Sequence, residues 1–553
     1  MQALKYLPKL NRRYAAVIRR YTAVPKLNRR YTAVPKLNRR YAAVIETLHS
    51  SGPVIIMSKE ESEPASLPQL GDMSAEEFRR YGHQLIDWVA DYLSHPERYP
   101  VLSQNQPGDV KSALPSAPPV TGESFDDVLR DLDRIIVPGM THWNHPAFFA
   151  YFSISGSAPG ILGELLAAAF NVNAMLWRTS PAATELEEVT LDWLRQMIGL
   201  PDTFSGVLYD TASISSLCAI AAAREAAPAG RLRLYASEHA HSSIEKSAIT
   251  LGLGRGATRA IPSDDEFRMN VGALEAAIHE DRTNGWQPFC AVATVGTTST
   301  TSIDPVPQIA DLCEREKLWL HVDAAYGGSA AVLPEMKWIL AGAERADSLV
   351  MNPHKWLFVP VDLSVLYCRR MEVLKAAFSL VPEYLRTSEE TVRNYMDYGP
   401  QLGRRFRALK LWFVLRYFGV EGIAARLRHH IELAGELAAW VDESGDFERL
   451  APAPFSTVCF RAYPRDLRAR VGAEISEADI DAYLDQLNER MMEEVNRRGK
   501  VFLSHTKLKG KFTLRLAIGN IRTTREHIRL AWDELNAALE KLDAELRPAR
   551  LRN

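Results

Sequence analysis

Short apolar segments alternate with helix-patterned stretches between residues 206 and 368, and this alternation limits the possible fold more than any other feature. The alanine-rich stretch 213–226, for example, separates two apolar segments. Strands separated by helices are typical of a mostly parallel sheet covered by helices on both faces. The sequence therefore predicts an α/β domain, with strands at 206–209, 231–236, 289–295, 318–323, 347–351 and 364–368.

Segments with helical spacing lie on both sides of this region. The C-terminal part mixes strands and helices less regularly, which predicts a smaller α+β domain. The stretch 104–121 is rich in Pro, Gln and Ser, and we expect an extended connection there. Helices are expected at 74–94, 125–136, 158–170, 181–198, from 404 to about 441, at 476–497 and at 524–544, and further strands at 455–460 and 512–518. We divide the chain into a basic arm (1–56), an N-terminal helical segment (57–152), a large domain (153–441) and a small C-terminal domain (442–553).

The arm repeats a basic decapeptide, Pro-Lys-Leu-Asn-Arg-Arg-Tyr-(Ala/Thr)-Ala-Val, from Pro8, Pro25 and Pro35. Basic residues with interleaved tyrosines could bind nucleic acid, and an Arg-rich, acid-free segment could direct the chain to an organelle. A translated DNA repeat upstream of a start at Met57 or Met73 is the third interpretation, and we favour it because ten-residue units are too short for solenoid repeats.

Composition favours a cytoplasmic protein with a small substrate. The net charge is -2, which does not suit a polyanion-binding protein. The five cysteines are scattered without metal-ligand spacing, so we expect reduced thiols and no metal site. The longest apolar stretch, 161–177, contains Glu164 and two asparagines, and we expect no membrane span.

A lysine and an aspartate follow two neighbouring apolar segments. Lys355 lies in Asn-Pro-His-Lys-Trp (352–356), and Asp323 ends the segment 318–323. Alone, Lys355 would be interpreted as a surface lysine and Asp323 as a turn cap. An acid at the carboxyl end of a buried parallel strand, however, lies where open α/β sheets bind ligands. Pyridoxal 5′-phosphate (PLP) needs such a carboxylate at its pyridine nitrogen and a lysine that holds it as a Schiff base. The pair is therefore a candidate PLP site.

Two further segments supply groups that such a site requires. Thr211, Ala212 and Ser213 follow a predicted strand and begin a helix. They are either an ordinary N-cap or a phosphate site, because free amides at a helix N-terminus bind anions. His241 lies in a loop before another helix. It is either a solvated histidine or one stacked on the pyridine ring, where it could relay protons.

These motifs together resemble the group II PLP-dependent decarboxylases, specifically the aromatic-L-amino-acid decarboxylases. The resemblance runs from about Met73 to Leu542, and its most specific parts are His-Val-Asp-Ala-Ala-Tyr (321–326) and Asn-Pro-His-Lys-Trp. The stretches 142–146, 149–152, 180–187, 240–243 and 402–407 are also similar to the family. The resemblance implies a type I, aspartate-aminotransferase-like fold. It also implies a homodimer with active sites at the interface.

The resemblance implies roles for individual residues. Lys355 would hold the cofactor, Asp323 would pair with its pyridinium nitrogen, and Ala325 and His241 would pack on the two faces of its ring. Thr298 would lie near the phenolic oxygen of the cofactor. Ala212, Ser213, Asn352 and His354 would surround the phosphate. The substrate pocket would be lined by Trp143, Tyr151, Phe152, Val361 and Gly403, with Met175 from the partner subunit.

The same resemblance favours decarboxylation over oxidation. In the family, a tyrosine of a mobile loop delivers a proton to the substrate's Cα, and Tyr384 matches it. Relatives that form aldehydes with oxygen typically carry Phe at this position or Asn in place of the stacking histidine. Because the chain keeps Tyr384 and His241, we expect an amine and CO2 as products. An oxygen-dependent aldehyde synthase is the alternative.

The substrate is expected to be an aromatic L-amino acid with a large ring. In relatives, glycine at the position of Gly403 accompanies indolic substrates, so tryptophan and 5-hydroxytryptophan lead, followed by DOPA, tyrosine and phenylalanine. Val361 and Met175 stand where the animal enzyme has Phe, which changes the pocket walls. Asp210 replaces the usual glycine beside the phosphate loop, and its carboxylate must turn away from the phosphate or weaken its binding.

Overall fold

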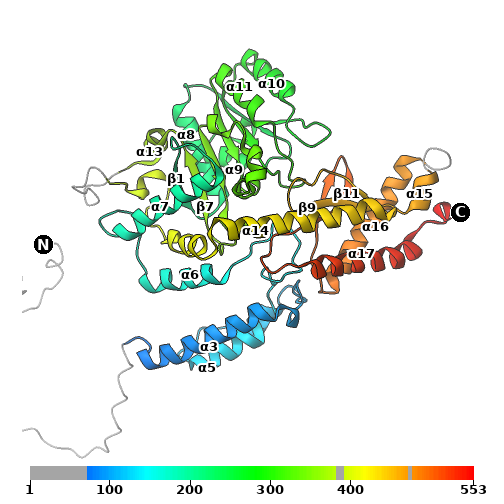
Figure 1. The fold of residues 1–553 in the computed structure, drawn as a ribbon, viewed down its shortest axis with the longest axis horizontal. Helices are drawn as coiled ribbons and strands as arrows, with labels where there is room; N and C mark the ends of the chain where they lie inside the picture. The colour runs from blue at the N-terminus through cyan, green and yellow to red at the C-terminus, as the bar shows by residue number, and fades with distance from the viewer. Residues whose placement is uncertain (1–70, 381–391, 471–475, 553) are drawn as a thin grey trace, which may run out of the picture. The chain divides into compact units, whose positions relative to one another are not determined.

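The computed structural model describes residues 71–380, 392–470 and 476–552 (Figure 1). The chain divides into two units, Met1–Gly82 and His83–Asn553. The described residues of the first unit, 71–82, contain the start of helix α3 (Ala75–Ser94). Ser74 and Glu77 form a capping box there, because the Glu77 amide donates to Ser74 Oγ and the Ser74 amide donates to Glu77 Oε2, each at 3.2 Å. Both sheets and the other described helices belong to the second unit.

A seven-stranded, mostly parallel sheet forms the centre of the second unit, as predicted. Its strand order is β1-β7-β6-β5-β4-β2-β3. Strands β2 to β6 are parallel to their neighbours within that group, whereas β7 is antiparallel to both β6 and β1. The strands are β1 (Ser205–Tyr209), β2 (Leu232–Ser237), β3 (Thr258–Ile261), β4 (Gln287–Thr294), β5 (Trp319–Asp323), β6 (Ser348–Met351) and β7 (Ser364–Cys368).

Alternating side chains give this sheet two buried faces. In β5, Leu320 and Val322 pack into a core that includes residues of α7, α10 and α11. Trp319 packs on the opposite face, in a core formed largely with α8 and α9. Successive strand residues point to opposite faces, so Asp323 lies on the face of α8. The helices are α7 (Pro181–Ile198), α8 (Ala212–Ala226), α9 (Ser243–Thr250), α10 (Val271–Thr283) and α11 (Val306–Glu316).

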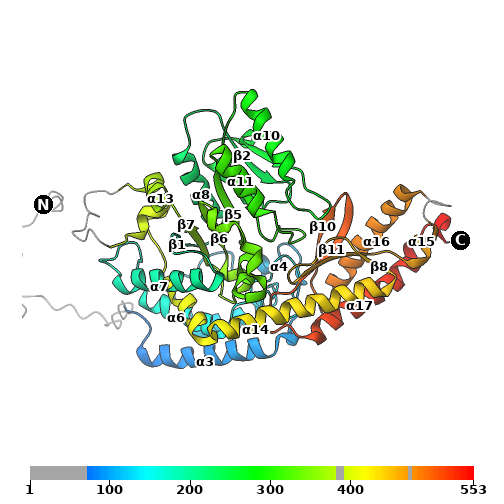
Figure 2. The same cartoon turned by 45° about the horizontal axis from the view of Figure 1, so that its top comes forward.

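A smaller antiparallel sheet follows, with the strand order β10-β11-β9-β8. Helix α14 connects the two sheets: it packs against α6 and α7 near one end and against β8 and β9 near the other (Figure 2). Gly419 breaks its helical geometry with a φ of 64°. The elements are α14 (Arg407–Ser444), β8 (Phe447–Arg449), β9 (Thr457–Ala462), α15 (Arg465–Arg470), α16 (Glu477–Arg497), β10 (Ser504–Leu508), β11 (Lys511–Ala517) and α17 (Arg525–Leu546).

The other described elements lie before and between these. The predicted helices 158–170 and 125–136 are confirmed as α6 and as α5 followed by η3. The stretch 104–121 was expected to be extended throughout, but it contains α4. These elements are η2 (Pro96–Arg98), α4 (Asp109–Ala113), α5 (Phe125–Asp131), η3 (Leu132–Ile136), α6 (Ala158–Phe170), η4 (Arg255–Ala257), η5 (Gly327–Val332), η6 (Pro334–Leu340), η7 (Ala343–Arg345), α12 (Pro353–Trp356), α13 (Met371–Phe378), η9 (Tyr395–Tyr398) and η10 (Ala549–Leu551).

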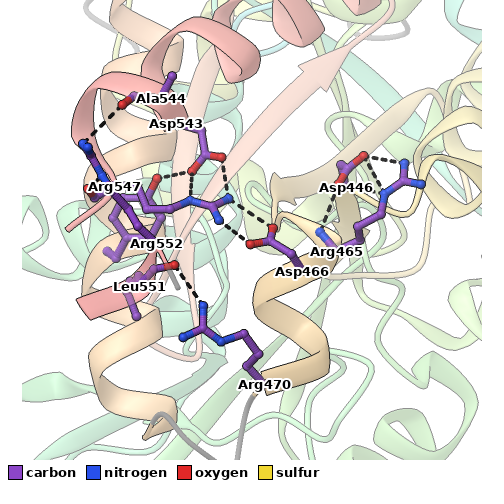
Figure 3. Close-up of polar contacts among 10 residues, drawn as sticks. Asp446, Arg465, Asp466, Arg470, Asp543, Ala544, Arg547, Leu551 and Arg552 are labelled. Carbon is purple, nitrogen blue, oxygen red and sulfur yellow. Dashed lines mark hydrogen bonds and ion pairs between the residues drawn. The ribbon is translucent and has the colours of Figure 1, made fainter. Parts of the chain in front are cut away.

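Arginines attach the C-terminal end of the chain to helices α15 and α17 (Figure 3). Arg547 Nε donates to Asp543 Oδ1 of α17 at 2.9 Å, and its Nη2 donates to Asp466 Oδ1 of α15 at 3.1 Å. Arg470 Nη1 donates to the carbonyl of Leu551 at 3.1 Å. One guanidinium therefore joins two helices that are far apart in sequence.

The five cysteines are buried and unpaired. No helix among the described residues is long and apolar enough to cross a membrane. Within the same residues, no cluster of three or more His, Cys, Asp or Glu side chains could hold a metal ion.

Candidate active site

The carboxyl ends of β5 and β6 meet at one edge of the large sheet. The amide of Ala324 donates to the Val350 carbonyl at 2.9 Å, and the amide of Asn352 donates to the Ala325 carbonyl at 3.1 Å. These bonds join the segment after Asp323 to the segment that carries Lys355. The edge therefore brings together two groups that lie 32 residues apart in the sequence.

Asp323 and Lys355 interact electrostatically at this edge. Asp323 is buried, and its Oδ1 accepts the amide of Ala325 at 3.1 Å. Its other oxygen accepts no hydrogen bond from the described residues. Burial lowers the pKa of the Lys355 amine, the Asp323 carboxylate opposes this shift, and the positive charge of Arg515 adds to it. Lys355 is therefore easier to deprotonate than a surface lysine, which favours a nucleophilic amine.

His241 interacts electrostatically with both Lys355 and Asp323. Its Nδ1 accepts the Ser243 amide at 3.2 Å and lies 2.8 Å from Ser243 Oγ. A nitrogen that accepts an N–H carries no proton, so the neutral ring has its proton on Nε2. Burial lowers the pKa of His241, the charge of Lys355 lowers it further, and Asp323 opposes both. The charges of Lys355 and Asp323 thus both act on the pKa of His241, and that of Asp323 acts on the pKa of Lys355.

Asn352 and His354, in the same motif as Lys355, form a polar pair. His354 Nδ1 accepts the Leu363 amide at 2.9 Å, so the proton of its neutral ring is on Nε2. Asn352 Nδ2 lies 3.4 Å from that Nε2, while Asn352 Oδ1 is buried without a partner in the described chain. Two N–H groups cannot bond to each other. A half-turn of the amide is therefore favoured, which places Oδ1 on Nε2–H and leaves Nδ2 as a free buried donor. Burial lowers the pKa of His354 to about 3, which keeps the ring neutral.

The N-terminus of α8 provides further donors on the face of the sheet that carries Asp323. Thr211 is its N-cap and makes no side-chain cap bond, and Ala212 and Ser213 begin the helix. Their amides have no partner inside the helix. Asp210, whose orientation the sequence left open, places Oδ1 2.6 Å from the Thr211 amide and Oδ2 3.3 Å from Gln401 Nε2. Its carboxylate is held beside the first turn of α8.

The predicted aromatic residues pack against one another and against their neighbours. Trp143 and Tyr151 stack on each other with ring centroids 5.8 Å apart. Phe152 stacks on Tyr326 at 4.0 Å, and Lys355 Nζ lies 5.1 Å from the centroid of the Phe152 ring. Phe152 is thus an aromatic wall at the amine of Lys355.

Other predicted pocket residues make contacts of their own. Asn173 joins two of them: its Nδ2 donates to Met175 Sδ at 3.3 Å, and a Cβ added at Gly403 would lie 3.7 Å from the same Nδ2. Within the described ranges, neither Met175 nor Gly403 shares a hydrogen bond, ion pair or ring contact with Lys355. Val361 is exposed, and so is Thr298 in the loop after β4. Tyr384 lies outside the described residues.

Arg515 of β11 was not predicted from the sequence. Its guanidinium carbon lies 4.5 Å from the centroid of the Phe152 ring, next to Lys355. The signal available was a single charged residue, an arginine, within the predicted strand 512–518. A charged residue in a strand whose other side chains pack into a core indicates a functional site only when the face of the sheet on which it lies is known.

Comparisons with known proteins support the resemblance. A family model, the pyridoxal-dependent decarboxylase conserved domain, matches residues 107–463. Tyrosine decarboxylase 4 of Petroselinum crispum is 41% identical over 484 residues, 84% of this chain and 94% of that protein. Aromatic-L-amino-acid decarboxylase of Sus scrofa is 39% identical over 508 residues, 87% of this chain and 100% of that protein. The solved structure of Oryza sativa TDC with PLP and tryptamine matches with a TM-score of 0.81 at 36% identity, covering 86% of this chain and 99% of that one. Phenylacetaldehyde synthase of Petunia hybrida is also similar, at 39% identity over 479 residues.

Proposed function

This chain belongs to the pyridoxal-dependent decarboxylase family and is a PLP-dependent enzyme with the type I fold, and from that premise we propose that it converts an aromatic L-amino acid into the arylalkylamine and CO2. The observation that carries the proposal is the contact between Lys355 Nζ and the ring of Phe152, which places an aromatic wall beside the amine. An aromatic side chain of the substrate can pack against such a wall.

The described residues fit the cofactor. Lys355 supplies an amine with a lowered pKa, and Asp323 supplies a buried carboxylate with one free oxygen. Asn352 supplies a buried amide donor for the phosphate, and the first turn of α8 supplies backbone amides. When bound, PLP supplies the electron sink that decarboxylation requires.

We assign to the surrounding residues the role of holding the cofactor and orienting the substrate. With PLP bound, Asp323 would hold a proton on the pyridine nitrogen, and Ala325 and His241 would pack on the ring. His241, with its proton on Nε2, could hold or donate a proton on its side of the ring. Tyr384 is assigned the proton delivery to Cα from its match to the family. Because the bond that breaks must lie perpendicular to the cofactor plane, positioning by these residues decides which reaction occurs.

We further propose that the enzyme is a homodimer. The resemblance places Met175 in the pocket of the partner subunit, and Met175 and Gly403 are joined through Asn173, so a second copy would complete one pocket. Four apolar side chains of α6 support this assignment, since they are exposed in the single chain: Leu162, Leu165, Leu166 and Phe170. A sedimentation measurement that finds only monomers in the active preparation would overturn it.

The preferred substrate is tryptophan or 5-hydroxytryptophan. The Cα of Gly403 has open space around it, because an added Cβ would meet only the Asn173 amide nitrogen, at 3.7 Å. A large indole ring can use that space. DOPA, tyrosine and phenylalanine follow in the expected order of preference.

Replacing Gly403 by serine should shift this preference toward phenolic substrates. The hydroxymethyl group fills the space next to Asn173, and a difference of that size is worth about 1–3 kcal/mol. We expect the ratio of kcat/KM for tryptophan to that for tyrosine to fall about 10-fold or more. Gly435→Ala in α14 is a suitable control, because a Cβ there meets nothing within 4 Å. An unchanged ratio in Gly403→Ser would remove Gly403 from the substrate pocket.

Replacing Asp210 by glycine should tighten cofactor binding. The carboxylate is held beside the first turn of α8, where it opposes a phosphate dianion. We expect the Kd for PLP, measured by fluorescence titration of the apoprotein, to fall about 5-fold, which corresponds to about 1 kcal/mol. Asp210→Asn should give most of the same effect because the charge is the cause. Weaker binding in both variants would place the phosphate elsewhere.

A product assay tests the reaction itself. The purified protein is incubated with a panel of aromatic amino acids, amines are identified by mass, and peroxide and ammonia are measured in parallel. Amine without peroxide supports decarboxylation, whereas aldehyde with peroxide and ammonia supports the alternative, an aldehyde synthase. Removing residues 1–56 should leave the amine yield unchanged. If the removal of residues 1–56 abolishes polyanion binding, the basic arm has a separate nucleic-acid function.

A further inference from the structure

A cavity of about 290 Å³ lies at the edge of the large sheet opposite the candidate active site. The parallel strands β4 and β5 begin at this edge, and the antiparallel strand β7 ends there. Strand β5 runs from Trp319, in the wall of the cavity, to Asp323 at the active site, which separates the two Cα atoms by about 13 Å. This distal cavity is therefore separate from the cofactor site.

The inner wall of the distal cavity is apolar. Trp319 and Phe289 lie in it, and both side chains are buried. Trp319 Nε1 donates to Ser348 Oγ at 2.9 Å, which fixes the orientation of the indole. The last turn of α8 contributes only two alanines, Ala223 and Ala226, whose small side chains leave the space open. The volume is close to the lower end of the range for small-molecule sites, so the cavity suits one ring system with a short substituent.

Both carboxylates in the wall of the distal cavity already have partners. Glu314 accepts two hydrogen bonds from Arg345, at 2.8 and 2.7 Å. A further nitrogen of Arg345 lies 2.7 Å from Asp311 Oδ1, so the charge of this arginine is balanced. Asp347 Oδ2 accepts the Leu320 amide at 3.0 Å. These groups hold the wall together and have little capacity left for the other cations.

Two consecutive arginines after β7 carry the charge that remains. Arg369 Nη2 lies 3.6 Å from Asp347 Oδ1, and Arg370 Nε lies 3.9 Å from Glu372 Oε1, and both distances are too long for a hydrogen bond. The guanidinium carbon of Arg370 lies 5.4 Å from the centroid of the Trp319 ring. Burial raises the pKa of Asp347, and the charges of Arg369 and Arg370 oppose that shift. The donors of both guanidinium groups are thus free for a ligand at the apolar wall.

We propose that the distal cavity binds a small aromatic carboxylate, with its ring against Trp319 and its carboxylate on Arg369 and Arg370. Aromatic rings pack well on one another, and a guanidinium group offers paired N–H donors that match a carboxylate. An aromatic amine carries the wrong charge for this edge of the sheet, and a bare anion leaves the apolar wall uncovered. The assignment does not rest on the proposed function, because the distal cavity shares no residue with the cofactor site.

Ligand-observed NMR titrations of the holoenzyme, with indole-3-acetate as the probe, test this site. We expect a Kd of about 0.1–1 mM, as for a ligand of this size. Ala226→Trp should abolish this binding, because the indole would fill the cavity from an exposed position at the end of α8. The double variant Arg369→Gln/Arg370→Gln should raise the Kd about 10-fold or more, since it removes the charged hydrogen bonds. Arg369→Lys/Arg370→Lys, which keeps both charges, should raise it less.

Two controls separate the distal cavity from other sites. Tryptamine has the same ring with a cation in place of the carboxylate, so its affinity should be equal in the wild type and in Ala226→Trp. Indole-3-acetate bound at the active site would be retained in Ala226→Trp, so only the binding lost in that variant reports on the distal cavity. Arg224 lies on α8 outside the cavity and donates to the Leu251 carbonyl at 2.9 Å. Arg224→Gln should leave the Kd for indole-3-acetate unchanged.

The melting temperatures of the variants should stay close to that of the wild type, because the changed side chains are exposed. The assignment is overturned if the wild type binds no indole-3-acetate at up to about 10 mM, or if Ala226→Trp and the double glutamine variant bind it as the wild type does. Loss of tryptamine binding in Ala226→Trp, or an equal loss of indole-3-acetate in Arg224→Gln, would also overturn it. Failure to release any amine from the amino-acid panel would instead overturn the proposed function and leave this site standing.

Discussion

Replacing Lys355 by alanine should lower the rate of CO2 release by about 10⁴-fold or more, because the variant loses the amine that holds the cofactor covalently. The lowered pKa of Lys355 and the buried Asp323 beside it mark this amine as the reactive one in the site. Borohydride reduction followed by peptide mass analysis provides a readout that does not depend on turnover. In the wild type, the mass of the cofactor should be found on the peptide that contains Lys355. In Lys355→Ala it should be absent from every peptide.

Lys246 provides the control for this experiment. It lies on α9, is exposed, and stands close enough to influence His241. Lys246→Ala should keep both the labelled Lys355 peptide and the activity. Labelling of another lysine in the wild type, or release of CO2 at the native rate by Lys355→Ala, would refute the assignment of Lys355.

Much of the fold could be predicted because the residues at the ends of many helices and strands themselves indicate where the element begins and ends. Helix α7 starts with Ser180 as N-cap and Pro181 in its first turn, and it ends at Gly199 with a φ of 82°. These residues favour helix ends for local reasons. Strands β3, β8 and β10 were missed. Strand β3 has four residues, including Arg259, β8 reads Phe-Glu-Arg, and β10 reads Ser-His-Thr-Lys-Leu, so none shows an apolar run. All three are edge strands, whose pairing depends on a neighbour and not on their own sequence.

The candidate site likewise contains some residues that could be predicted from the sequence and others that could not. Asp323 and Lys355 could be predicted because each lies in a compact motif at the end of an apolar segment. The position of Arg515 could not, because its contact with Ser299 depends on elements that the chain brings together from more than 200 residues apart.

Replacing Asp323 by asparagine should lower kcat by about 10²- to 10³-fold with little change in stability. The asparagine side chain would keep an oxygen for the amide of Ala325, which Asp323 Oδ1 accepts at 3.1 Å, so the loop between β5 and β6 should keep its geometry. The variant loses only the negative charge that holds a proton on the pyridine nitrogen, and the loss of one such electrostatic group costs about 3–4 kcal/mol of barrier. Asp323 also raises the pKa of Lys355 and of His241, so both values should fall in the variant. The acidic limb of the pH profile of kcat/KM should then move to lower pH.

Asp304 is the matched control, because it is a buried carboxylate of the same domain that serves the backbone. Its two oxygens accept the amides of Met269 and Thr294, each at 2.7 Å. Asp304→Asn must turn an N–H toward one of those amides, which costs about 1–3 kcal/mol of stability, while kcat should change by less than about threefold. The two variants should therefore separate: one loses rate and keeps stability, and the other loses stability and keeps rate. If Asp323→Asn instead behaves like Asp304→Asn, the carboxylate at the end of β5 supports the fold, and the cofactor nitrogen has another partner.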